Sequence, residues 1–84
     1  MKEETIISLD ISKINDIEIK DTLKFVYEVL AERGYNPINQ LVGYIMSGDL
    51  GYISSYKEAR NRIAKIDRTL LLEELLKSYL KWDI

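Results

Sequence analysis

The fold is decided by residues 34–49, which read GYNPINQLVGYIMSGD. Gly34 is suited to the left-handed conformation that ends a preceding helix. Asn36 is a favourable N-cap, and Pro37 fits the first helical position, where no amide donor is needed. The stretch therefore predicts that one helix ends before Gly34 and that another begins at Pro37.

The helix that begins at Pro37 is predicted to be buried and central. Its apolar positions follow helical spacing at Ile38, Leu41, Val42 and Ile45. Tyr35 lies just before the cap and is placed to pack on Leu41 as a hydrophobic staple. A short helix that is apolar on most of its sides is typical of a protein interior.

Three further residues of this stretch have predicted structural roles. Gly43 lacks a side chain, so a neighbouring element can approach the helix closely there. Gly48 is placed to end the helix in the left-handed conformation, and Asp49 is placed to cap the next turn of the chain. We expect a turn or a single helical turn over residues 49–53.

The first half of the chain contains a second predicted helix, over residues 16–33. Asn15 and Glu18 have the spacing of a capping box at its start. The apolar residues behind them share one helical face at Ile19, Leu23, Val26, Tyr27 and Leu30. Residues 1–14 show neither helical nor strand periodicity, so we expect a flexible tail there.

Two more helices are predicted in the second half of the chain. Ser55 and Glu58 again have capping-box spacing and predict a helix over residues 56–66. Asp67 is placed to cap a fourth helix over residues 68–82. The apolar stripe of that helix is broad and comprises Leu71, Leu72, Leu75, Leu76, Tyr79 and Leu80.

Together these elements predict an all-α fold, a compact bundle of four main short helices. The flexible tail would occupy residues 1–14, and the helical domain would occupy residues 15–84. A chain of 84 residues buries only a small core. Because the first and fourth helices carry apolar stripes too wide for such a core, we expect a homodimer.

Composition excludes several classes of function. The chain has no cysteine and no histidine, which excludes disulfides, thiolate chemistry and the usual zinc ligands. It has no Gly-rich phosphate loop and no nucleophile motif, so we predict no enzymatic activity and no cofactor. No apolar run approaches the roughly 20 residues of a membrane span, and we expect a soluble, cytoplasmic protein. The net charge of -2 gives no global attraction to nucleic acid.

The predicted third helix has a local positive charge. Its basic side chains, which are candidates for binding a partner protein or a phosphate group, are Lys57, Arg60, Arg62 and Lys65. A solvated helix face is one alternative interpretation. Another is a small helical nucleic-acid-binding regulator that uses residues 56–68.

One series of residues, in order over roughly residues 20 to 81, is far more specific than a short motif. It comprises Gly34, Tyr35, Asn36, Pro37, Gln40, Gly43, Tyr44, Ser47, Gly48, Asp49, Tyr52, Ile53, Ala59, Arg60, Arg68, Glu73, Glu74, Leu75, Tyr79 and Leu80. The series resembles the IreB family of small bacterial regulators, the ReoM-like proteins. The resemblance implies a homodimeric, non-enzymatic regulator of peptidoglycan synthesis and of resistance to cell-wall antibiotics.

The resemblance also implies partners and a modification site. A transmembrane Ser/Thr kinase that senses the cell wall would phosphorylate the protein, and a cognate phosphatase would reverse the reaction. The regulator would promote Clp-protease turnover of the cell-wall enzyme MurA until phosphorylation relieves that action. The corresponding acceptor in this chain is Thr5, with Ser8 as the fallback.

Charge suggests how such a phosphate acts. Residues 1–18 carry five acidic and two basic side chains, a net charge of -3, while residues 56–68 carry five basic and two acidic ones, a net charge of +3. The two segments should attract each other. We expect phosphorylated Thr5 either to dock on Arg60 and Arg62 or to repel the target protein directly.

Overall fold

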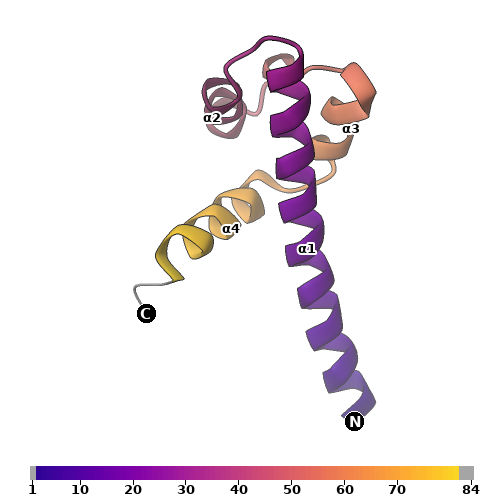
Figure 1. Cartoon of the computed structure of the whole chain (residues 1–84). Helices are drawn as coiled ribbons and strands as arrows, with labels where there is room; N and C mark the ends of the chain where they lie inside the picture. Colours follow the sequence, from indigo (N-terminus) through magenta and orange to yellow (C-terminus); the bar gives the residue numbers. More distant parts are fainter. Residues whose placement is uncertain (1, 82–84) are drawn as a thin grey trace.

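The computed structural model describes the backbone of residues 2–81 and the side chains of residues 16–81. Every regular element in that part of the chain is helical. In order they are α1 (Lys2–Glu32), α2 (Pro37–Ser47), the short 3-10 helices η1 (Leu50–Tyr52) and η2 (Tyr56–Glu58), α3 (Ala59–Ala64) and α4 (Arg68–Leu80). In Figure 1, α2 and α3 lie on opposite sides of the C-terminal end of α1, and α4 runs away from α1 at an angle. The predicted all-α fold with four main helices is confirmed.

Helix α1 begins much earlier than the sequence pattern suggests. It runs without interruption from Lys2, so the predicted start near Asp16 is wrong, and Asn15 and Glu18 lie within the helix rather than at its cap. Residues 2–32 contain no glycine or proline, so nothing in the local sequence stops the helix there. The side chains of residues 1–15 lie outside the described part, and the flexible tail stays a prediction.

The connection between α1 and α2 has the geometry that its sequence predicts. Gly34 has a φ of 87°, and its N–H donates to the carbonyl of Ala31 at 3.0 Å while the N–H of Tyr35 donates to Leu30 at 3.0 Å. This pair of bonds is a Schellman motif, and it satisfies carbonyls that the end of α1 leaves free. The Asn36 side chain then accepts a bond from the N–H of Asn39 at 3.1 Å, with Pro37 at the first helical position.

The core is built around α1 rather than around α2. Its buried apolar side chains are Ile19, Val26, Val29, Leu30, Tyr44, Ile53, Ala59, Ile63 and Leu71. Helix α2 contributes only Tyr44 to this set, and its Met46 is 78% exposed. The prediction of a buried, central α2 is therefore wrong. Most of its apolar surface faces outward because α1 covers one side of it only.

The start of α3 also differs from the prediction. Lys57 and Glu58 both have left-handed backbone conformations, and α3 begins at Ala59 instead of Tyr56. Ser55 makes no capping bond with its side chain. Instead, the hydroxyl of Ser54 accepts a bond from the N–H of Tyr56 at 3.0 Å. Contacts with the rest of the fold have overridden the local capping-box pattern.

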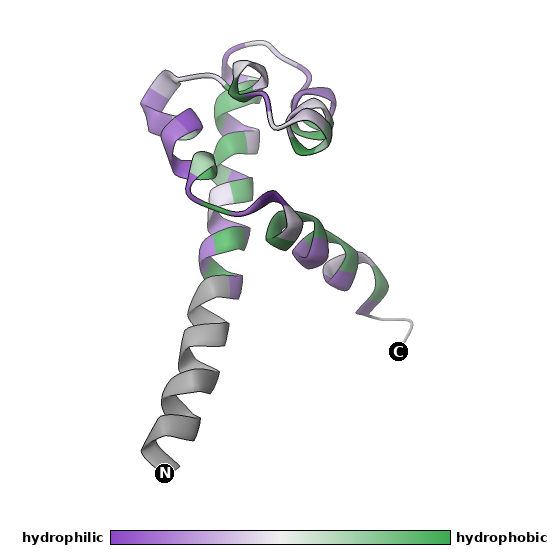
Figure 2. Cartoon of the chain, turned by 180° about the vertical axis from the view of Figure 1, so that it is seen from behind, coloured by the Kyte–Doolittle hydropathy of each residue, from purple (hydrophilic) through white to green (hydrophobic). Residues whose placement is uncertain are grey.

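Helix α4 starts where the sequence predicts. The Asp67 carboxylate accepts a bond from the N–H of Thr69 at 2.7 Å and so caps the first turn. The helix ends at Leu80, two positions before the predicted end, and residues 82–84 lie outside the described part. Only Leu71 of α4 is buried. Figure 2 shows hydrophobic residues along the part of α4 that stands away from α1.

Candidate functional site

Lys57, the first of the basic residues predicted to bind a partner, lies in η2 and contacts the C-terminal end of α1. Its ammonium group lies 3.4 Å from a carboxylate oxygen of Glu32, and both side chains are about half exposed. It also lies 5.3 Å from the centre of the Tyr56 ring, while the guanidinium of Arg33 lies 4.8 Å from the same ring. Lys57 therefore fastens a loop to α1 in addition to carrying positive charge.

Arg60 is turned toward the protein. Its Nε–H donates to the carbonyl of Ile53 at 2.8 Å in a partly buried position, and its backbone N–H donates to the carbonyl of Ser54 at 3.1 Å. Ile53 is itself fully buried. Arg60 thus holds the segment before α3 against the core, and only part of its guanidinium is left for a partner.

Arg62 faces α1. Its guanidinium lies 4.2 Å from the centre of the Phe25 ring, which is a cation–π contact. It also lines a shallow hollow of about 360 Å³ with Ile17, Glu18 and Asp21. The two acidic neighbours reduce the positive potential that Arg62 presents to an anion.

The four candidate residues do not converge on one point. Lys57 contacts the end of α1, Arg60 contacts Ile53, and Arg62 contacts Phe25 in the C-terminal half of α1. Lys65 follows α3 and is exposed. A nucleic-acid groove needs basic side chains along one face, so this dispersal disfavours the nucleic-acid alternative.

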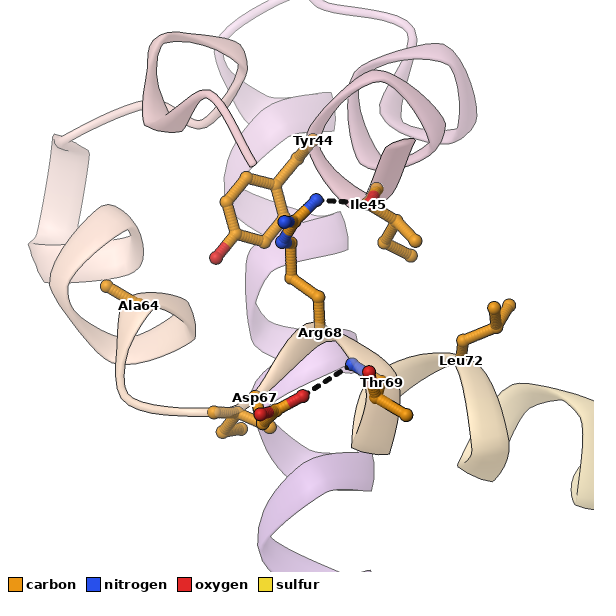
Figure 3. Close-up of a pocket in the computed structure, with 8 residues that line it drawn as sticks. Tyr44, Ile45, Ala64, Asp67, Arg68, Thr69 and Leu72 are labelled. Carbon is orange, nitrogen blue, oxygen red and sulfur yellow. Dashed lines mark hydrogen bonds between the residues drawn. The ribbon is translucent and has the colours of Figure 1, made fainter. Parts of the chain in front are cut away.

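A hollow of about 560 Å³ lies between the end of α2 and the start of α4 (Figure 3). Its polar groups come from Asp67, Arg68 and Thr69, and Tyr44 and Leu72 are among its apolar walls. The Asp67 carboxylate and the Thr69 amide already bond each other. The hollow therefore combines one guanidinium with one carboxylate and has no net charge from these groups.

Arg68 has a structural role that sequence reasoning missed. Its Nη1 donates to the carbonyl of Ile45 at 2.8 Å, one of the carbonyls that the last turn of α2 leaves free. Its guanidinium also lies against Gly48, where an added Cβ would stand 2.8 Å from Cζ of Arg68. Gly48 has a φ of 77°, so it ends α2 and makes room for the arginine. No local pattern predicts this contact, because Arg68 is 23 positions from Ile45 in sequence.

An apolar groove of about 420 Å³ is formed by α1, α2 and α4. It is lined by Leu23, Lys24, Tyr27, Ile38, Leu41, Val42, Ile45 and Leu75. Ile38 and Val42 are more than half exposed, although both were predicted to be buried. The stripe that sequence reasoning assigned to the core therefore forms an open apolar surface.

Neither a metal cluster nor a membrane-spanning helix occurs among the described residues. Among residues 16–81, no three acidic side chains gather closely enough to hold a metal ion. No helix among the described residues is long and apolar enough to cross a bilayer. Thr5 and Ser8, the predicted phosphoacceptors, lie outside the residues whose side chains are described.

The described residues form a small helical domain with an open apolar groove, and exposed apolar surfaces of this kind mark interaction sites. Comparison with known families agrees, since the model of the IreB regulatory phosphoprotein family matches residues 3–81. The chain therefore belongs to the IreB regulatory phosphoprotein family. Membership assigns it a regulatory role and favours a non-enzymatic one.

Proposed function

We propose that this chain is a non-enzymatic regulator that is switched by Ser/Thr phosphorylation near its N-terminus. The observation that carries the proposal is the match to a family of regulatory phosphoproteins over residues 3–81, a range that includes Thr5 and Ser8. Thr5 is the proposed acceptor and Ser8 the fallback. The modifying enzymes would be a transmembrane Ser/Thr kinase that senses the cell wall and its cognate phosphatase.

The regulated process is proposed to be peptidoglycan synthesis, and with it resistance to cell-wall antibiotics. The unphosphorylated protein would act in the cytoplasm and promote Clp-dependent turnover of MurA. Its open groove and exposed basic side chains suit contact with another protein better than chemistry on a small molecule.

The acceptor is tested by intact mass after incubation with a kinase of the cell-wall-sensing class. We expect the addition of one phosphate to the wild-type chain and none to Thr5→Ala, with Ser8→Ala as the matched control that is still modified. If Thr5→Ala gains the phosphate and Ser8→Ala does not, Ser8 is the acceptor. An unmodified wild-type chain would contradict the proposal.

The target is tested in cells by the half-life of MurA. Deletion of the regulator is expected to lengthen that half-life, and Thr5→Ala, which cannot be switched off, is expected to shorten it. A MurA half-life that is the same in all three strains would contradict the assignment to this enzyme. That result would not contradict the proposed phosphorylation.

Self-association through α4 is also proposed. Its large apolar side chains that are at least two-fifths exposed are Leu70, Leu72, Leu75, Leu76, Tyr79 and Leu80. Apolar side chains exposed together along one helix mark an interaction surface. A second copy of the chain is a partner that can cover it.

The charges of α4 favour an antiparallel arrangement of two copies. Glu73 and Glu74 lie in its first half, and Lys77 and Lys81 lie toward its end. A two-fold axis across the helix places the acidic half of one copy beside the basic half of the other. The same polarity would oppose a parallel pairing, because like charges would then face each other.

Sedimentation at low micromolar concentration tests this pairing. We expect a dimer for the wild-type chain and a monomer for Leu76→Glu. Met46→Glu is the matched control, since it places the same charge at an exposed apolar residue outside α4. A stable wild-type monomer would contradict the proposal, and so would a Leu76→Glu chain that is still a dimer.

A further inference from the structure

The loop of residues 54–58 has a backbone conformation that its own residues disfavour. Lys57 has a φ of 53° and Glu58 a φ of 65°, and both therefore lie in the left-handed region. A side chain with a Cβ atom is disfavoured there, and neither lysine nor glutamate is among the tolerant residue types. At its other two positive-φ positions in the described part, the chain uses glycine. Contacts with the rest of the protein must therefore hold this loop.

Those contacts come from two directions. On the side of α3, the backbone N–H of Arg60 donates to the carbonyl of Ser54 at 3.1 Å. On the side of α1, the Lys57 ammonium meets Glu32 at 3.4 Å and the Arg33 guanidinium lies over the Tyr56 ring. The contacts with α1 are between exposed groups, and such contacts are individually weak. A loop in a disfavoured conformation is thus held on one side by weak, accessible contacts.

The same residues carry the signals for a different conformation. Ser55 and Glu58 have capping-box spacing, yet Ser55 makes no capping bond in the structure. If residues 56–58 were right-handed, α3 would begin at Tyr56. Tyr56 would then share a helical face with Ala59 and Ile63, which are both fully buried. In the observed loop Tyr56 is instead 38% exposed.

In the change between these two conformations, the backbone groups that lose one hydrogen-bond partner gain another. In the longer helix the N–H of Arg60 would donate to the carbonyl of Tyr56 instead of that of Ser54. The carbonyl of Ser54 would be left to water, which is acceptable because Ser54 is only partly buried. The hydroxyl of Ser55 would gain the N–H of Glu58, and two left-handed residues would be relaxed.

We propose that residues 54–58 form a two-state element, in which the observed loop exchanges with an α3 that is longer by residues 56–58. The contacts of Lys57 with Glu32 and of Arg33 with Tyr56 shift the exchange toward the loop, and the bond of Arg60 to Ser54 holds the loop from the side of α3. An acidic segment that binds Lys57 and Arg33 removes both contacts and favours the longer helix. The exchange itself is independent of the proposed function, whereas its use as a response to a regulatory partner rests on that function.

The test compares two variants of the free, full-length chain by NMR. Lys57→Gly and Lys57→Val both remove the ammonium group that meets Glu32, but glycine accepts the left-handed conformation and valine does not. We expect Lys57→Gly to keep the loop, with left-handed HN–Hα couplings at position 57 and at Glu58. The relief of the left-handed penalty outweighs the loss of one weak, exposed contact. We expect Lys57→Val to give helical couplings and shifts over residues 56–58. The ratio of the two states should differ between the variants by about tenfold or more, given the usual penalty of a left-handed residue.

A second substitution distinguishes the longer helix from simple disorder. Ser55→Ala removes a cap that only the longer helix uses, so it should leave the loop of Lys57→Gly unchanged. In Lys57→Val it should return residues 56–58 toward the loop or to disorder. Glu28→Gly and Glu28→Val, at an exposed position inside α1, are the matched control pair and should leave the signals of residues 54–60 in place.

Two results would overturn the proposal. One is a Lys57→Val chain that is folded but keeps left-handed couplings at positions 57 and 58. The other is a Lys57→Val chain in which residues 56–58 are disordered both with and without Ser55→Ala. Because no kinase or partner takes part, either result would leave the proposed phosphorylation untouched.

Discussion

At the scale of single residues, Gly43 is the clearest case in which a missing side chain makes a contact possible. A Cβ built on Gly43 would lie 2.5 Å from Cε1 and 2.7 Å from Cδ1 of Tyr52. The ring of Tyr52 therefore lies against the backbone of α2, as the sequence predicts for a close approach at this glycine. The side chain of Gln40 supports the arrangement by donating to the carbonyl of Tyr52 at 3.0 Å.

We expect Gly43→Leu to lower the free energy of unfolding by about 1 to 3 kcal/mol or more, because the new side chain must displace the Tyr52 ring. Urea denaturation measures the loss. The control is the same substitution in a Tyr52→Ala chain, in which the space beside Gly43 is already empty. There Gly43→Leu should lower the free energy of unfolding clearly less. An equal cost in both backgrounds would show that the Tyr52 ring is not what Gly43 accommodates.

Arg68 provides a second test at this scale. We expect Arg68→Met to reduce the free energy of unfolding by about 1 to 2 kcal/mol, because it keeps the aliphatic stem but removes the bond to the carbonyl of Ile45. Lys65→Met is the control, since Lys65 is an exposed basic residue close by in sequence. It should change stability by no more than about 0.5 kcal/mol. Equal losses in the two variants would mean that Arg68 contributes through charge alone.

At the scale of elements, predictions succeeded where the signal and its structural consequence lie within one turn. Gly34 ends α1, while Asn36 and Gly48 bound α2, through bonds to residues three or four positions away, and Pro37 occupies the first helical position. A sequence pattern contains all of that information. The burial of α2 was mispredicted because its apolar residues face a groove, and a periodic pattern does not say whether its apolar face is covered.

Two element starts were mispredicted for opposite reasons. Asn15 and Glu18 have capping-box spacing, but no residue before them breaks the helix, so α1 continues through them. Ser55 and Glu58 have the same spacing, but the chain takes a loop instead. The bond of Arg60 to Ser54 and the contacts of Lys57 and Tyr56 with the end of α1 hold that loop. The contact of Arg68 with Ile45 had no local signal at all. The sequence predicts which basic residues make up the candidate site. It does not predict where their side chains point, because Arg60 and Arg62 are oriented by Ile53 and Phe25.

The length of α1 leads to a prediction about this helix. The buried apolar residues of the described part begin at Ile19, and we expect the core to form without the turns before Asp16. We expect Asn15→Pro to reduce far-UV helicity while changing the free energy of unfolding by less than about 1 kcal/mol, because proline is tolerated at the first turn of the helix that would restart there. Val26→Pro, at a fully buried position, is the control and should unfold the chain. A large loss of stability in Asn15→Pro would show that the first turns of α1 contribute to the fold.

At the scale of the whole molecule, the described core residues all follow the proposed phosphoacceptors in the sequence. The core joins the second half of α1 to Tyr44, Ile53, α3 and the start of α4. Thr5 and Ser8 precede all of these residues. We therefore expect a phosphate added there to change charge and binding while the core stays folded, as a regulator that works in both states requires.

The distance along α1 restricts how phosphorylated Thr5 can reach the basic residues of α3. Arg62 lines its hollow with Ile17, Glu18 and Asp21. A helix rises about 1.5 Å per residue, so a continuous α1 places Thr5 roughly 20 Å from Glu18 along its axis. Docking on Arg62 within one subunit therefore requires the first turns of α1 to unwind. The alternative is docking on the second subunit of the proposed dimer.

Phosphorylation is accordingly expected to shift the amide signals of α3 residues near Arg62, and within-subunit docking should also reduce the helicity of residues 2–15. The phosphate adds about -1.5 to -2 charges, but exposed ion pairs are weak, so the docked form should be only partly populated. Arg62→Gln should abolish the shifts in α3. Lys65→Gln, which removes an equal charge from the adjoining position after α3, is the matched control and should preserve them. Arg60 is a poorer choice for this test, because its substitution also breaks the bond to Ile53. Shifts confined to the first dozen residues would eliminate docking and leave direct repulsion of the target as the mechanism.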